Sequence, residues 1–148
     1  MRNWLMAGMA GAAMLAACSP GEGATARAQV PAASGAQAAR HPVSGLEVID
    51  LVVERGTKKI PFKVELAASP EAQSRGLMFR TELGDFEGMI FPSGTPQPRS
   101  FWMKNTPLSL DIIFIGPDGR ILNIAANTVP NSLQPVSSNG SASAVLEL

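Results

Sequence analysis

Residues 100–120 constrain the fold of this chain more than any other stretch, because they contain two strand-like runs separated by a turn. Residues 110–115 are almost entirely apolar, which is typical of a strand that is buried on both faces. The sequence Gly-Pro-Asp-Gly at residues 116–119 predicts a tight turn, and residues 120–125 return as the antiparallel partner. Residues 99–104 predict a further strand with Ser100, Trp102 and Lys104 on one face and Phe101 and Met103 on the other.

A second β-unit precedes this stretch. Residues 46–54 are rich in Val and Ile, and residues 59–67 alternate between apolar and polar side chains. The alternation places Ile60, Phe62, Val64 and Leu66 on one face and Lys59, Lys63 and Glu65 on the other. The two runs predict a hairpin with a turn at residues 55–58, and Pro61 indicates a sheet edge or a bulge.

One short helix is predicted between these units. Ser69 is a suitable N-cap, Pro70 fits the first helical position, and Gly76 marks the end. The rest of the chain predicts a brief strand at 88–91, a proline-rich loop at 92–98, a long loop at 127–140 and a last strand at 142–148. We therefore expect an α+β, mainly β fold: a compact single domain built on a small mixed sheet or a partly closed barrel.

The N-terminus has the pattern of an export signal. Arg2 precedes an apolar run over residues 4–17, and at roughly 14 residues this run is too short to span a bilayer comfortably. It ends in Leu-Ala-Ala-Cys, which resembles a bacterial lipoprotein signal with acylation at Cys18. Cleavage after Ala28, at an Ala-Arg-Ala site, is the alternative.

These features predict the domain boundaries and the cellular location of the protein. Residues 1–17 are the signal, residues 18–45 are a flexible Ala-, Gly-, Pro- and Ser-rich tether, and residues 46–148 are the domain. His41 falls in the tether and receives no role. We expect a lipid-anchored protein on the periplasmic side of the cell envelope. Ser19 in place of aspartate favours the outer membrane over the inner membrane.

Charge and cysteine content exclude several classes. The 148 residues carry zero net charge and only 16% charged residues, whereas a nucleic-acid-binding domain has a basic excess. A single cysteine cannot form an internal disulfide. We expect no nucleic-acid partner and no cofactor.

Three motifs resemble one known family. They are RGLMFR at 75–80, EGMIF at 87–91, and FWMKNT at 101–106 followed by LDIIFI at 110–115. In this order and spacing they are similar to the bacterial and archaeal family catalogued as domain of unknown function 192. The resemblance implies a compact, β-rich, often exported domain with no established activity. Members usually continue past the final strand into a glycine-containing segment that this sequence lacks, so either the last strand is terminal or the domain is cut short at Leu148.

The predicted ligand site is a polar pocket near the FWMKNT motif. An arginine fork and a lysine suit a carboxylate or phosphate, and a tryptophan can stack on a ring. We expect Trp102, Lys104 and Asp111 to lie close together, with Arg75, Arg80 and Asn105 beside them. The structural alternative is that Asp111 pairs with Lys104 or Arg80 to satisfy a buried charge.

Other chemistry has weaker support. Met78, Met89 and Met103 lie one in each motif and offer soft ligands for copper, although methionines beside aromatics more often fill a core. Asp85 and Glu87 form an acidic loop that does not define a pair of catalytic carboxylates. We assign no catalytic residue and expect a binding or accessory domain for a small anionic ligand or an envelope protein. The alternatives are an enzyme acting on envelope glycans or peptides and a structural partner of another envelope protein.

Overall fold

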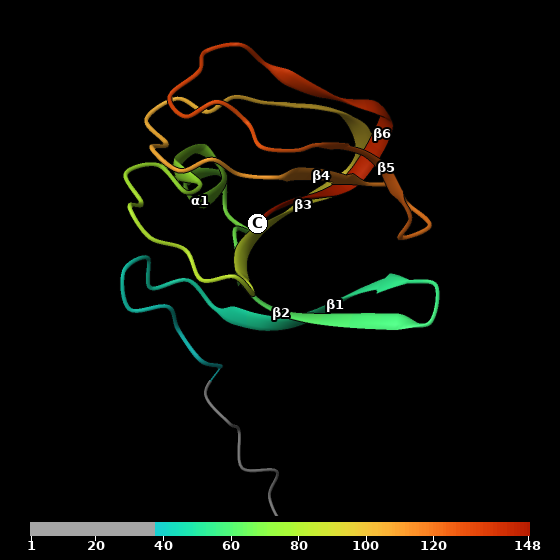
Figure 1. The fold of residues 1–148 in the computed structure, drawn as a ribbon, viewed down its shortest axis with the longest axis horizontal. Helices are drawn as coiled ribbons and strands as arrows, with labels where there is room; N and C mark the ends of the chain where they lie inside the picture. Colours follow the sequence, from blue (N-terminus) through green and yellow to red (C-terminus); the bar gives the residue numbers. More distant parts are fainter. Residues whose placement is uncertain (1–37) are drawn as a thin grey trace, which may run out of the picture. The chain divides into compact units, whose positions relative to one another are not determined.

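The computed structural model describes residues 38–148, which form six strands and one short helix (Figure 1). In chain order the elements are β1 Val48–Arg55, β2 Lys58–Leu66, α1 Pro70–Arg75, β3 Glu87–Phe101, β4 Ile112–Ile115, β5 Ile121–Ala125 and β6 Val136–Glu147. The predicted signal, Cys18 and residues 18–37 of the predicted tether lie outside the described residues. No helix in the described part is long and apolar enough to cross a membrane.

All six strands belong to one curled sheet that forms a half-barrel. Their order is β1-β2-β3-β6-β4-β5. The β2–β3 pair is parallel and every other neighbouring pair is antiparallel, so the sheet is mixed. The predicted fold class, mainly β with one short helix, is confirmed.

The two predicted hairpins are present. In β1–β2, Val52 lies opposite Pro61, and the β2–β3 ladder begins only at Lys63, so Pro61 lies where β2 has a single neighbour. In β4–β5 the turn closes through the Gly116 N–H, which donates to the Arg120 carbonyl oxygen at 2.8 Å.

Helix α1 has the predicted caps. The Ser69 hydroxyl accepts a hydrogen bond from the Ala72 N–H at 3.1 Å, and Pro70 occupies the first turn. Gly76 ends the helix with a φ of 50°, a conformation that is costly for any residue with a Cβ atom.

The prediction of a proline-rich loop at residues 92–98 was wrong, because these residues are part of β3. Their pairing with β6 has register shifts between Pro92 and Gln97 and between Pro98 and Ser100. Bulges of this kind accommodate residues that cannot donate a ladder hydrogen bond. The loop predicted at 127–140 is likewise shorter, because β6 already begins at Val136.

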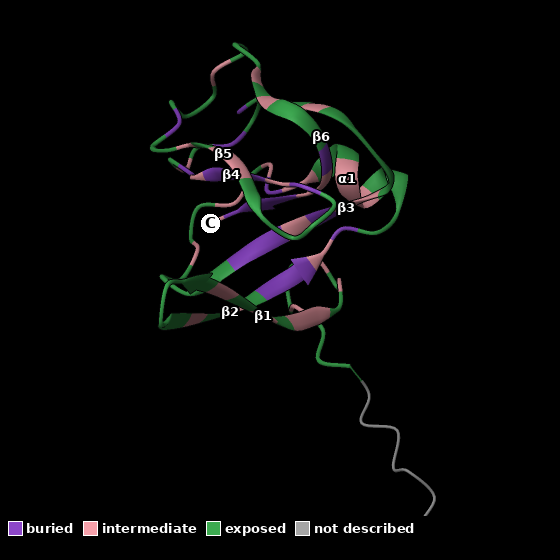
Figure 2. Cartoon of the chain, turned by 90° about the vertical axis from the view of Figure 1, so that its right-hand side faces the viewer, coloured by how far each residue is buried: buried purple, intermediate pink, exposed green. Residues whose placement is uncertain are grey.

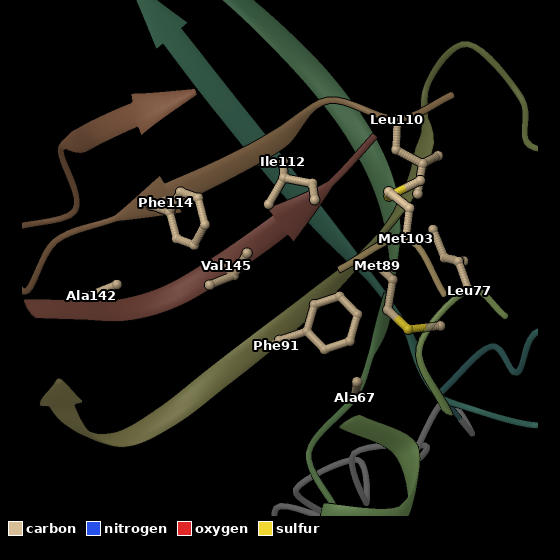
Figure 3. Close-up of a cluster of buried hydrophobic side chains, with 10 residues drawn as sticks. All are labelled: Ala67, Leu77, Met89, Phe91, Met103, Leu110, Ile112, Phe114, Ala142 and Val145. Carbon is tan, nitrogen blue, oxygen red and sulfur yellow. The ribbon is translucent and has the colours of Figure 1, made fainter. Parts of the chain in front are cut away.

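The main core lies on one face of the sheet (Figure 3). It consists of Ala67, Leu77, Met89, Phe91, Met103, Leu110, Ile112, Phe114, Ala142 and Val145. A smaller cluster of Val64, Ile113 and Leu146 belongs to the other face. Buried residues concentrate on the strands, and the turns are mostly exposed (Figure 2). Because side chains alternate along β6, Glu147 shares a face with Val145 and therefore points toward the main core.

Candidate functional site

A cavity of about 450 Å³ opens beside α1 and is lined by residues from both halves of β3 and from the end of β6. Its volume falls in the range of small-molecule sites. Fourteen residues line it: Pro70, Gln73, Ser74, Arg75, Gly76, Leu77, Met78, Phe91, Arg99, Ser100, Phe101, Trp102, Thr106 and Glu147. The lining combines apolar core residues with two guanidinium groups and one carboxyl group.

Glu147 is the most unusual of these residues. It is only 5% exposed, and none of the ion pairs found within residues 38–148 includes it. Loss of hydration raises the pKa of its carboxyl group to about 8. At neutral pH the side chain is therefore mainly a neutral acid that can donate a hydrogen bond into the cavity.

Arg99 is a fixed cation in this lining. Its guanidinium donates hydrogen bonds to the Ser93 hydroxyl at 2.7 Å and to Gln73 Oε1 at 3.3 Å. It also lies 5.3 Å from the centre of the Phe101 ring. Partial burial lowers the Arg99 pKa, but an arginine remains charged at neutral pH. These neutral partners orient the guanidinium and leave its charge uncompensated.

Arg75 and Trp102 complete the polar side of the cavity. Arg75 comes from the last turn of α1, and Trp102 directly follows β3 and is 49% exposed. The ammonium group of Lys104 lies 5.2 Å from the centre of the Trp102 ring, a cation–π geometry. The cavity thus joins two arginines, an accessible aromatic ring and a neutral acid.

A larger cleft of about 1020 Å³ lies on the opposite face of the sheet, over Leu51, Ile90, Ile113 and Leu146. Its charged residues, Glu54, Asp118 and Arg120, are all well exposed; Arg120, for example, is 87% exposed. Charges so well hydrated bind little by themselves. The smaller cavity is the better candidate because Glu147 is buried in its lining and Arg99 is partly buried.

The structure brings only some of the predicted site residues together. Arg75 and Trp102 line the cavity, and Lys104 stacks on Trp102. Asn105 is in the adjoining turn, where its carbonyl oxygen accepts from the Phe79 N–H at 2.7 Å and its side chain approaches the Met78 sulfur at 3.9 Å.

Asp111 and Arg80 lie elsewhere. The Asp111 carboxylate accepts a hydrogen bond from the Asn127 N–H at 2.7 Å, and its backbone pairs with Leu148. Within residues 38–148 it forms no ion pair with Lys104 or with Arg80. The expected cluster of Trp102, Lys104 and Asp111 is therefore reduced to its first two members.

Arg80 instead pairs with Glu65 of β2. Its terminal nitrogen donates to both carboxylate oxygens, at 2.7 and 2.8 Å, and the Ser44 hydroxyl donates to the same carboxylate. His41 Nδ1 lies 3.6 Å from that carboxylate, although no role was expected for His41. Glu65 is only 3% exposed, although it was expected on the polar face of its strand. It is buried because residues 40–47 and Arg80 cover it.

The remaining candidates have ordinary surroundings. Met89 and Met103 are buried in the main core and Met78 lines the cavity. Glu87 accepts a hydrogen bond from the Gly84 N–H at 3.1 Å. In the part of the chain that the structure describes, no group of three His, Cys, Asp or Glu side chains could hold a metal ion.

Two residues of the cavity were missed by the sequence reasoning: Glu147 and Arg99. A lone glutamate in the apolar strand sequence AVLEL, two residues after Val145, was the available signal for Glu147. Arg99 was expected as the first residue of the strand predicted at 99–104, and no motif marked it as a site residue.

Comparison with known proteins shows two related crystal structures. One is a protein of unknown function from Novosphingobium aromaticivorans, with 49% identity and a TM-score of 0.73, covering 77% of this chain and 81% of that one. The other, from Sinorhizobium meliloti, is described as a candidate transcription regulator. It has 38% identity and a TM-score of 0.63, and covers 66% of this chain and 75% of that one. Comparison with curated proteins gave no match.

The model of the family DUF192, described as Uncharacterized ACR, matches residues 51–148. This range includes all six strands except the start of β1, and all the residues that line the cavity. The resemblance indicated by the three motifs is thus confirmed, and no specific activity is attached to the family. The chain belongs to the DUF192 family.

Proposed function

We propose that this domain binds a small anionic ligand in the cavity between α1 and the ends of β3 and β6. The observation that carries the proposal is the cavity's charge balance: Arg75 and Arg99 face a space whose only carboxyl group among the described residues, Glu147, is neutral at pH 7. A neutral acid leaves the positive potential of the guanidinium groups intact and adds a hydrogen-bond donor.

The ligand class follows from these groups. Arginine forks bind carboxylate or phosphate groups through paired hydrogen bonds. Trp102 offers an apolar ring face at the mouth of the cavity. A ligand of this class therefore has one carboxylate or phosphate group and a planar or ring-shaped apolar part.

An enzyme is the alternative, favoured by the raised pKa of Glu147, which suits a general acid. The glycosidase arrangement needs two carboxyl groups across the substrate, and the described lining provides one. We therefore place binding first. Turnover of a cell-wall extract that is lost in Glu147→Gln would reverse this order.

The place of action in this proposal is the cell envelope. The apolar run at residues 4–17 followed by Cys18 supports export and acylation. Incorporation of labelled palmitate into the wild type but not into Cys18→Ser would support the anchor, and equal labelling would refute it. The zero net charge gives no reason to carry over the regulatory description of the Sinorhizobium relative.

A thermal-shift experiment tests the ligand site. The probes are inorganic phosphate, acetate and an aromatic carboxylate, because a ligand that binds only the folded state raises the melting temperature by mass action. We expect at least one probe to stabilise the wild type and to lose this effect in Arg99→Ala.

The matched control is Arg120→Ala, which removes an exposed guanidinium from the distant β4–β5 turn. General salt effects on stability act on all three proteins alike. If no probe stabilises the wild type more than it stabilises Arg99→Ala, the proposed anion site is wrong.

A further inference from the structure

Three loops at one end of the sheet are joined by backbone hydrogen bonds. The Phe79 N–H donates to the Asn105 carbonyl oxygen at 2.7 Å, which links the loop after α1 to the turn after β3. The Met103 N–H donates to Ser132 at 3.0 Å and the Asn131 N–H to Thr106 at 3.0 Å, which link that turn to the loop before β6. The three segments, residues 77–80, 102–106 and 127–133, form what we call the loop face.

The backbone of the loop face is strained. In residues 38–148, every non-glycine residue with a positive φ lies here: Phe79 at 65°, Asn105 at 56°, Asn127 at 50° and Asn131 at 59°. Asparagine adopts this conformation readily, but a bulky aromatic residue does so at a cost. Such strain persists where the surrounding structure enforces it, and it is concentrated at functional sites.

The strain coincides with exposed apolar side chains. Phe79 is 66% exposed, Trp102 49%, Val129 70% and Leu133 65%. They come from all three segments, Val129 and Leu133 from the same one, and Trp102 and Val129 border one cavity of about 260 Å³. Apolar side chains that stand apart from one another suit insertion into a fluid lipid bilayer more than packing against a rigid protein partner. Exposed apolar groups gathered in this way mark an interaction surface.

The charged side chains that the loop face itself contributes, Arg80 and Lys104, are cationic, and the nearby Asp111 carboxylate accepts a hydrogen bond from the Asn127 N–H. Lys104 stacks on Trp102, and residues 102–106 and 127–133 contain no acidic side chain. Tryptophan together with lysine is typical of the boundary between lipid headgroups and acyl chains. Lysine near such a surface also gains from anionic lipids.

The first described residues, which include His41, are held by hydrogen bonds and lie beside this face. Arg80 directly follows Phe79, and its guanidinium lies 3.4 Å from His41 Nε2 and binds Glu65. Residues 39–48 are held in turn by hydrogen bonds such as that from the Val48 N–H to Ala39 at 2.7 Å. Only 19 residues lie between Cys18 and Ala38, and the tether predicted there would have a mean reach of about 25 Å. An anchor at Cys18 would therefore keep the loop face close to the bilayer.

We infer that the loop face docks on the surface of a lipid bilayer, with Phe79, Trp102, Val129 and Leu133 at the level of the headgroups and Lys104 toward anionic lipids. This inference rests on the proposed anchor at Cys18. The loop face adjoins the ligand cavity, because Trp102 belongs to both, but the docking does not depend on what the cavity binds. It orients an anchored domain that would otherwise tumble on its tether.

The test uses the full chain with Trp4→Phe, so that Trp102 is the only tryptophan. The protein is incorporated through its own N-terminus into vesicles of phosphatidylethanolamine and phosphatidylglycerol, with or without bromine on the acyl chains. Bromine quenches tryptophan only at close range. We expect brominated vesicles to reduce Trp102 emission, and both kinds of vesicle to shift it to the blue and shield it from iodide.

Leu133→Ser and Val129→Ser should each reduce the quenching, whereas the control Val52→Ser, which changes an exposed residue of β1, should not. Cooperative melting of each variant checks its fold, and the wild-type measurement stands without the variants. If Trp102 stays unquenched and accessible to iodide in the anchored protein, the membrane inference is wrong. A partner protein would then be the occupant to seek.

Discussion

Two glutamates of the sheet are almost equally buried and have opposite surroundings. Glu65 of β2 is 3% exposed and Glu147 of β6 is 5% exposed. Glu65 accepts hydrogen bonds from Arg80 and Ser44, and His41 lies nearby. Glu147 has no such ion pair within residues 38–148, and burial raises its pKa to about 8.

The difference separates a structural carboxylate from a candidate functional one. Arg80 and Ser44 compensate the charge of Glu65, and together they join β2 to the loop after α1 and to residues 40–47. At Glu147 the fold leaves a polar group facing a cavity. Strong pKa shifts caused by burial in a cavity are concentrated at functional sites.

The largest effect is expected from breaking the compensated pair. Arg80→Ala leaves the Glu65 carboxylate buried without its cation, and removing one partner of a buried pair typically costs about 3–5 kcal/mol. We expect this loss in the free energy of unfolding, measured by denaturant titration. Arg120→Ala, which removes an exposed guanidinium, should change stability by less than about 0.5 kcal/mol. Similar small losses in both variants would show that the Glu65 pair is not structural.

The uncompensated glutamate should appear in the pH dependence of stability. Between about pH 4.5 and about pH 8 the unfolded chain releases the Glu147 proton and the folded domain keeps it. Stability from this group is therefore present below this window and falls as pH rises through it, by about 1.4 kcal/mol per pH unit, or about 3 kcal/mol over two units.

Glu147→Gln should abolish this fall, because glutamine has nearly the same shape and does not ionise. The measurement is the free energy of unfolding of both proteins at several pH values. Parallel pH profiles for the wild type and Glu147→Gln would show that Glu147 titrates normally. The proposed difference between Glu147 and Glu65 would then be wrong.

A third carboxylate, Asp111, is intermediate in its surroundings, and its substitution should have the smallest effect on stability. Asp111 is partly exposed and accepts one backbone hydrogen bond, from the Asn127 N–H. Asp111→Ala should cost about 1 kcal/mol, the usual net value of one such bond. Lys104→Ala in the Asp111→Ala background should add to this loss independently, because the two side chains form no ion pair. A coupling energy above about 0.5 kcal/mol in this double-mutant cycle would mean that they interact after all.

Much of the fold could be predicted from local pattern. The β1–β2 hairpin follows from alternation, α1 from Ser69, Pro70 and Gly76, and the burial of residues 110–115 from their apolar run. β3 could not, because its prolines are tolerated only through bulges that depend on how β6 pairs with it. Local sequence does not contain that information.

The site was predictable only in part. Trp102 and Arg75 were recognised from their motifs. Whether a charged side chain is paired, buried or exposed, however, depends on which other segments cover it. Glu65 and Glu147 are each the only glutamate of their strand and each lies between two apolar residues, and only tertiary structure places Arg80 over one and a cavity over the other. For the same reason, nothing local indicated that Asp111 would turn to Asn127 and away from Lys104.

The central claim is that Glu147 is a neutral acid at pH 7, and a direct measurement of its pKa tests it. The protein is labelled with ¹³C at glutamate carboxyl carbons, and its NMR signals are followed over pH, with Glu147→Gln identifying the resonance. The structure predicts a midpoint near pH 8, well above the ordinary value of 4.5. A midpoint close to 4.5 would contradict the account, because the cavity would then hold a carboxylate that repels the proposed anionic ligand.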